Sequence, residues 1–116
     1  MLIEEKEGFI RQKASEHIPE TNDKILWSLH AVKKLRVEGV RKKDVEDSLI
    51  ECIIVEDYTM EGRPLPGCLV LGFIGSIPVH SVIAIDSVLD RIFIITVYKP
   101  STERWEDDWN RRKTKD

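Results

Sequence analysis

The sequence predicts an α+β fold in which N-terminal helices pack on a four-stranded antiparallel meander, with a short C-terminal helix after it. The length of 116 residues suits one compact domain with its own core. Apolar residues recur with a helical period in the first half and gather into short β-branched runs in the second half. The connections between these runs are short, which favours antiparallel pairing.

We divide the chain into an N-terminal helical extension (1–20), a single α+β domain (21–112) and a polar tail (113–116). The extension is charged, its few apolar residues are spaced as in a helix, and Pro19 ends it. We expect it to dock on the core or on a second subunit. A homodimer is therefore one candidate assembly.

Two helices are predicted to open the domain, the first over residues 22–37 and the second from about 42 to 51. The first carries one apolar stripe at helical spacing, made of Ile25, Leu29, Val32 and Leu35. One of residues 21–23 can cap its start, and Gly39 can end it.

Four strands are predicted to follow these helices: 52–58, 68–74, 78–86 and 91–98. A loop rich in glycine and proline (59–67) joins the first two strands, and Gly75-Ser76 supplies a tight turn. After Pro100, a short helix is predicted to carry Trp105 and Trp109 on one face.

Composition excludes several functional classes. The formal net charge of −3 argues against a wholly basic nucleic-acid binder, although it leaves room for a local basic surface. The polar N-terminus predicts no secretory signal, hence a cytoplasmic protein. Residues 68–85 are long enough to span a membrane, but their glycines and Pro78 indicate two strands. The two cysteines and three histidines lack metal-ligand spacing, so we expect no metal or cofactor, and buried free cysteines.

A basic segment on the first domain helix is a candidate phosphate-binding surface. His30 and Lys34 lie four residues apart on one helical face, and Lys33 and Arg36 are nearby. Such cations hold a phosphate backbone electrostatically, without reading its sequence. Taken alone, this segment is better interpreted as a solvated helix face, which is what charge runs usually are.

Three polar side chains interrupt the aliphatic strands. His80 is a candidate general acid or base, and equally a satisfied core histidine. Thr96 and Tyr98 share one face of the last strand, and the tyrosine hydroxyl is suited to orienting a phosphate. An even-length turn that pairs Asp86 with Arg91 places His80 opposite Val97, whereas a one-residue bulge, or a three- or five-residue loop, brings Thr96 or Tyr98 onto its face. Both registers remain open at this point.

The order of these motifs resembles a small prokaryotic domain-of-unknown-function family. The resemblance runs from Ser28-Leu29-His30-Ala31, through Ile54-Val55-Glu56-Asp57-Tyr58 and Pro78-Val79-His80, to Ile95-Thr96-Val97-Tyr98, Pro100 and Trp105. The family looks allied to RelE-like and BrnT-like toxins, which are metal-independent ribonucleases with helices packed on an antiparallel sheet. Antitoxins of the MqsA kind would then be the protein partners.

This resemblance implies roles for individual residues. His30, His80 and Tyr98 would be catalytic, while Lys34 and Thr96 would bind the RNA phosphates, together with Lys33 and Arg36 of the neighbouring basic segment. Lys34 stands where the family phrase has arginine, and it keeps the charge without the bidentate fork. Glu38 stands where the family often has arginine and reverses the charge.

Two functions therefore compete. The first is a metal-independent ribonuclease toxin, or an inactive relative of one, restrained by an antitoxin protein. The second is a non-catalytic module that binds another protein, for which the first strand could offer an open edge. The ribonuclease hypothesis requires that the rings of His30 and His80 open onto one electropositive cleft.

Overall fold

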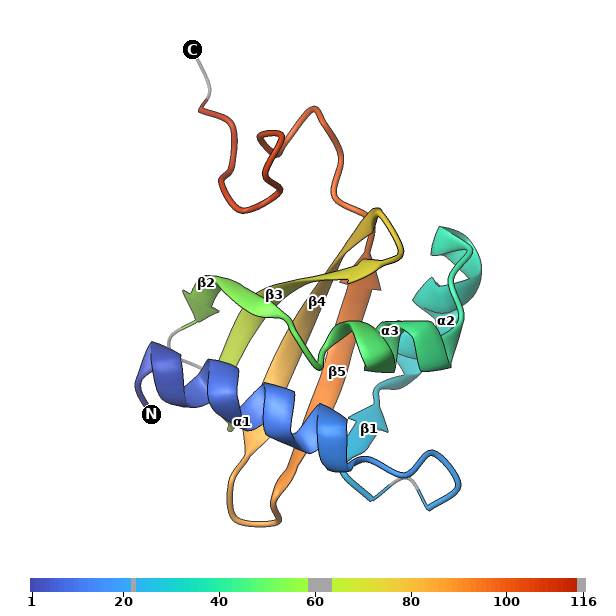
Figure 1. Ribbon diagram of the computed structural model, residues 1–116, viewed down its shortest axis with the longest axis vertical. Helices are drawn as coiled ribbons and strands as arrows, with labels where there is room; N and C mark the ends of the chain where they lie inside the picture. The colour runs from blue at the N-terminus through green and yellow to red at the C-terminus, as the bar shows by residue number, and fades with distance from the viewer. Residues whose placement is uncertain (22, 59–63, 115–116) are drawn as a thin grey trace.

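The computed structural model describes residues 1–21, 23–58 and 64–114, and within these ranges the chain forms three helices and one five-stranded sheet (Figure 1). The elements in chain order are α1 (Ile3–Glu16), β1 (Ile25–Trp27), α2 (Leu29–Glu38), α3 (Lys42–Ser48), β2 (Ile53–Tyr58), β3 (Gly67–Ile74), β4 (Ile77–Asp86) and β5 (Arg91–Tyr98). The α+β class is confirmed. Part of the loop predicted at 59–67 lies outside the described residues.

The predicted four-stranded antiparallel meander is wrong in one respect, because the sheet is mixed and has a fifth strand. Its order is β1-β5-β4-β3-β2. The four predicted strands form the antiparallel run β2-β3-β4-β5, and β1 adds to its edge, parallel to β5. Ile25 pairs with Ile92 and Trp27 with Ile94.

The helix predicted for residues 22–37 begins later, at Leu29. Residues 25–27 form the β1 strand instead, which adds to the sheet edge beside β5. Ser28 then starts the helix, because its Oγ accepts a hydrogen bond from Ala31 N at 3.0 Å. The left-handed Gly39 ends α2, as predicted.

One face of the sheet, which we call the helix face, carries the aliphatic core. In Figure 1, α1 and α3 cross this face. Ile10 of α1 and Leu49 after α3 are fully buried in one cluster with Val70, Ile83 and Ile94 of the strands. Cys52 and Cys68 are buried and free, as predicted, and burial raises the pKa of each thiol to about 12.

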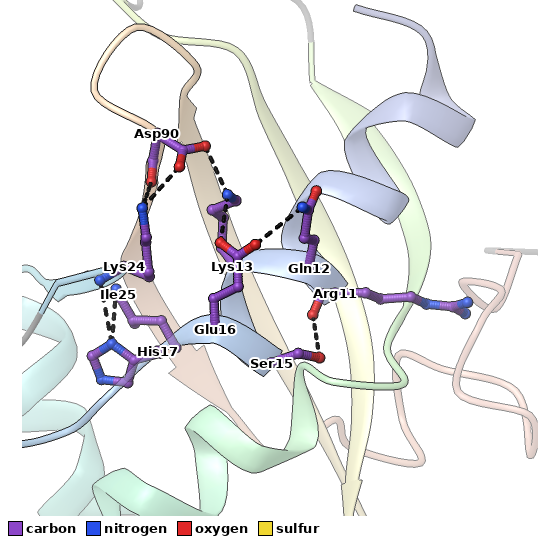
Figure 2. Close-up of polar contacts among 9 residues, drawn as sticks. All are labelled: Arg11, Gln12, Lys13, Ser15, Glu16, His17, Lys24, Ile25 and Asp90. Carbon is purple, nitrogen blue, oxygen red and sulfur yellow. Dashed lines mark hydrogen bonds and ion pairs between the residues drawn. The ribbon is translucent and has the colours of Figure 1, made fainter.

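Charged side chains hold helix α1 against the turn that joins β4 to β5 (Figure 2). Lys13 is buried and donates to Asp90 and Glu16, each at 2.7 Å. Asp90 also binds Lys24 Nζ at 2.8 Å. After the helix, His17 Nδ1 accepts hydrogen bonds from the backbone N–H groups of Lys24 and Ile25. The division at residue 20 into extension and domain stays a prediction.

A bulge in the β4–β5 pair settles the register. Asp86 pairs with Arg91, and beyond the irregularity Val82 pairs with Thr96 and His80 with Tyr98. The extra residue on β5 is Ile95, which lies between two paired positions. His80, Thr96 and Tyr98 therefore share the sheet face opposite the helix face, which we call the outer face.

The predicted C-terminal helix does not form. Residues 101–114, which we call the C-terminal segment, consist of turns with one antiparallel bridge between Trp105 and Arg112. Trp109 has a φ of 59°, in the left-handed region that a right-handed helix cannot include. Trp105 and Trp109 consequently do not share a helical face.

None of the helices in the described ranges combines the length and apolar character needed to cross a membrane.

Candidate functional site

The outer face holds a cluster of aromatic rings around His80. The His80 ring is fully buried, and Trp105 covers it edge-on with ring centroids 4.4 Å apart. Tyr98 packs on the same ring at 5.3 Å. Trp105 is itself 2% exposed, so the C-terminal segment seals His80 from solvent.

Both nitrogens of His80 have partners. Nε2 lies 2.7 Å from the carbonyl oxygen of Trp109, and Nδ1 lies 3.2 Å from the hydroxyl of Tyr98. A carbonyl oxygen can only accept, so Nε2 carries the hydrogen and donates it. Burial lowers the pKa of His80, which keeps the ring neutral and leaves Nδ1 as an acceptor.

Next to this cluster, the outer face opens into a basic cleft of about 510 Å³. Three parts of the chain line it, namely α2, the end of β5 and the C-terminal segment. The lining side chains are Lys34, Tyr98, Lys99, Ser101, Glu103, Arg104, Trp105 and Arg112. Four cations face one acid there, so the cleft is electropositive even though the whole chain has a net charge of −3.

Glu38 helps to shape the cleft. Its Oε1 accepts a 2.5 Å hydrogen bond from the backbone N of Lys99, and its Oε2 lies 3.7 Å from Lys34 Nζ. The acid thus fastens α2 to the end of β5 and holds Lys34 beside Tyr98. The charge reversal noted at this position has a structural role in this chain.

Arg112 is held by a second acid, Glu56 of β2. The guanidinium donates to Glu56 at 2.5 and 3.1 Å and lies over the Trp105 ring, 4.8 Å from its centroid. Arg112 lowers the pKa of Glu56 through these hydrogen bonds. Among the described residues, neither Lys99 nor Arg104 forms an ion pair, so their charges are available to a ligand.

His30 lies outside the aromatic cluster. It is exposed on α2, and its Nε2 lies 3.0 Å from Thr96 Oγ1. His30 is one helical turn from Lys34, which places it at the margin of the basic cleft. Thr96 and Tyr98 are two residues apart on β5, so the His30–Thr96 and His80–Tyr98 pairs lie side by side.

The expectation that both histidine rings open onto one cleft is wrong for His80. The ribonuclease hypothesis in its two-histidine form therefore fails, and His30 is the histidine that remains accessible as a general base. Its strand position points it to the outer face, but Trp105 closes over it. Lys33 and Arg36 border a separate surface hollow with Val32, away from the residues that line the basic cleft. Of the seven predicted site residues, Lys34 and Tyr98 line the cleft, and His30 and Thr96 lie beside it.

Sequence reasoning missed the cations of the C-terminal end. The cleft is lined by Lys99, Arg104 and Arg112. Contacts with residues distant in the sequence, such as that between Arg112 and Glu56, hold the C-terminal end in this place. The interleaving of tryptophans with arginines between residues 104 and 112 was the available signal, since aromatic and basic residues together are typical of nucleic-acid surfaces.

Within residues 1–21, 23–58 and 64–114, no group of three or more His, Cys, Asp or Glu side chains is placed to hold a metal ion.

Comparison with known proteins gives one result. No curated protein and no solved structure matches the chain, so the expected RelE-like architecture is not confirmed. A family model matches residues 27–99, from β1 past the end of β5. This match spans more than half of the chain, including His30, His80 and Tyr98, and the protein therefore belongs to the family described as Domain of unknown function (DUF4258).

Proposed function

We propose that the protein binds RNA in the basic cleft and cleaves it without a metal ion, as a toxin-type ribonuclease of the cytoplasm. The observation that carries this proposal is the convergence of Lys34, Lys99 and Arg104 from three segments on one cleft beside Tyr98. Cations arranged in this way suit a phosphate backbone. The kinship with RelE-like and BrnT-like toxins, and with antitoxins of the MqsA kind, rests on the sequence resemblance.

The proposed reaction uses the neighbouring 2′-hydroxyl of the RNA as the nucleophile. His30, exposed at the cleft margin, accepts the proton of this hydroxyl. The 2′-oxygen attacks the phosphorus, the bond from phosphorus to the 5′-oxygen breaks, and the 5′-oxygen takes a proton from solvent. The products are a 2′,3′-cyclic phosphate and a free 5′-hydroxyl. The cleft cations offset the charge that develops on the phosphate.

A cleavage and binding assay with labelled single-stranded RNA in EDTA tests this proposal. We expect cyclic-phosphate products, and we expect their loss in His30→Ala. We also expect that the Lys99→Gln/Arg104→Gln variant binds more weakly, with a salt dependence reduced by about 0.7 in log–log slope for each cation removed.

The matched control is Lys42→Gln/Lys43→Gln, which removes the same charge from the exposed surface at the start of α3. This variant should retain the affinity and salt slope of the wild-type chain. Equal losses in the two double variants would show that only net charge matters, and the cleft would lose its proposed role.

The alternative function, a module that binds another protein, is favoured by a different part of the outer face. An apolar groove of about 400 Å³ lies there between Leu65, Phe93 and Ile95. Intact RNA in the EDTA assay, together with a stable complex with the product of a neighbouring gene, would favour this alternative over the ribonuclease.

A further inference from the structure

The carbonyl group of Trp109 is held in an unusual backbone conformation. A φ of 59° is uncommon for any residue other than glycine, and for a residue as bulky as tryptophan it is an outlier. Such conformations persist where the surrounding structure enforces them, and they cluster at functional sites. The carbonyl oxygen of Trp109 lies 2.7 Å from Nε2 of the buried His80.

This contact determines the direction of the hydrogen bond between His80 and Tyr98, which lines the cleft. Because the carbonyl accepts from Nε2, Nδ1 of the neutral ring has no hydrogen and accepts one from the Tyr98 hydroxyl. The single hydrogen of that hydroxyl is therefore directed away from the cleft. The phenolic oxygen offers only its lone pairs to a ligand, so it accepts and does not donate.

An acceptor in a cationic cleft selects among the groups of a nucleic acid. A phosphate diester has no hydrogen to donate at neutral pH, so Tyr98 has nothing to accept from it. The ribose 2′-hydroxyl is a donor, it lies next to the phosphate, and DNA lacks it. We propose that Tyr98, oriented by His80 and the Trp109 carbonyl, accepts a hydrogen bond from the 2′-hydroxyl of a neighbouring ribose, not of the ribose whose 2′-hydroxyl gives its proton to His30, and so makes the cleft selective for RNA over DNA.

The neighbours of His80 are consistent with a ring that stays neutral. Burial lowers its pKa, the Glu56 carboxylate acts in the opposite direction, and Arg112 lies against that carboxylate. A charged ring would donate from both nitrogens and would force the Tyr98 hydrogen towards the cleft. The inference rests on the proposed function, because it concerns the ligand of the same cleft.

Paired binding measurements test the selectivity. An RNA oligonucleotide and its 2′-deoxy counterpart of identical base sequence are compared in a His30→Ala background, which prevents cleavage. We expect RNA to bind about three- to tenfold more tightly, the range of one net hydrogen bond. Adding Tyr98→Phe should bring the RNA-to-DNA ratio to about one.

Nitrogen-15 NMR of the histidine rings tests the orientation without any nucleic acid. We expect His80 to carry its hydrogen on Nε2 at pH 7. Trp109→Gly removes the indole but allows the left-handed backbone, so it should keep this tautomer. Trp109→Val also removes the indole, but its β-branched side chain disfavours that backbone, so it should give mixed tautomers.

The outcomes separate the two proposals. If neither oligonucleotide binds, the proposed function fails and this inference fails with it. If both bind equally, or if Tyr98→Phe leaves the ratio unchanged, the cleft binds phosphate but Tyr98 does not read the ribose. A hydrogen on Nδ1 of His80 in the wild-type chain overturns the inference even if Trp109→Val fails to fold.

Discussion

The two faces of the sheet use the same strands for different purposes. On the helix face, Ile83 and Ile94 pack with α1 and α3 into an aliphatic core. On the outer face, the alternate positions of the same strands carry His80 and Tyr98. The C-terminal segment covers His80, and the basic cleft lies next to it. The aliphatic core and the cleft that we propose to bind RNA thus lie on opposite faces of one sheet, so variants should separate their effects on stability from their effects on binding.

Truncation of neighbouring isoleucines gives the largest expected contrast. Ile94 is fully buried in the core, whereas Ile95, the bulge residue, is 38% exposed beside the apolar groove. Ile94→Ala should lower the free energy of unfolding by about 2–5 kcal/mol because it leaves a cavity. Ile95→Ala should cost about 1 kcal/mol. Urea denaturation of both variants measures this contrast, and similar losses would contradict the division between the faces.

A glycine on the helix face gives the next effect. A Cβ added to Gly72 would lie 2.9 Å from Ser48 Cβ and closer still to the Ser48 carbonyl oxygen. Gly72→Ala should therefore destabilise the protein by about 1–3 kcal/mol through overpacking. Gly8→Ala is the matched control, because no atom lies within 4 Å of the added Cβ. On α1 this control should stabilise the protein by about 0.5–1 kcal/mol. Thermal or urea denaturation distinguishes the two signs.

The smallest of the three expected effects is a loss of stability at acid pH, caused by the buried His80 of the outer face. Burial lowers the pKa of His80 in the folded protein, so near and below the ordinary histidine pKa of 6.5 the unfolded chain binds more protons than the folded one. Stability should therefore fall as the pH drops through 6.5 towards the lower folded pKa. Unfolding free energies measured between pH 7 and pH 5 follow this loss.

Two variants make this pH prediction specific. His80→Phe removes the titrating ring and should flatten the pH dependence in this window. His30→Asn keeps His80 and should retain it. A pH dependence that survives in His80→Phe would assign the acid sensitivity to another group.

The strands were predictable because their signal is local. Runs such as those around Val82 and Ile94, bounded by glycines, prolines and charged turns, identify strands without knowledge of their partners. The β1 strand was missed because Ile25 continues the helical spacing of Leu29 and Val32, while its strand conformation depends on pairing with Ile92. The contribution of a distant partner cannot be read from three residues.

The site was only partly predictable for the same reason. The sequence indicated His30, Lys34 and Tyr98, and it left the register of His80 open. The bulge at Ile95 that pairs His80 with Tyr98, and the contact between Arg112 and Glu56, depend on packing between distant segments. Trp105 covers the ring of His80, and the helix that was predicted to carry Trp105 does not form.

The parallel pairing of β1 with β5 also bears on how the protein is made. Residue 25 pairs with residue 92, so a nascent chain exposes its early strand until nearly all of the sheet has left the ribosome. Contacts this distant in sequence slow folding and prolong the exposure of apolar side chains. Synthesis halted before β5 would leave Ile25, Leu26 and Trp27 without their partner strand, and an unpaired apolar strand is prone to associate with other chains.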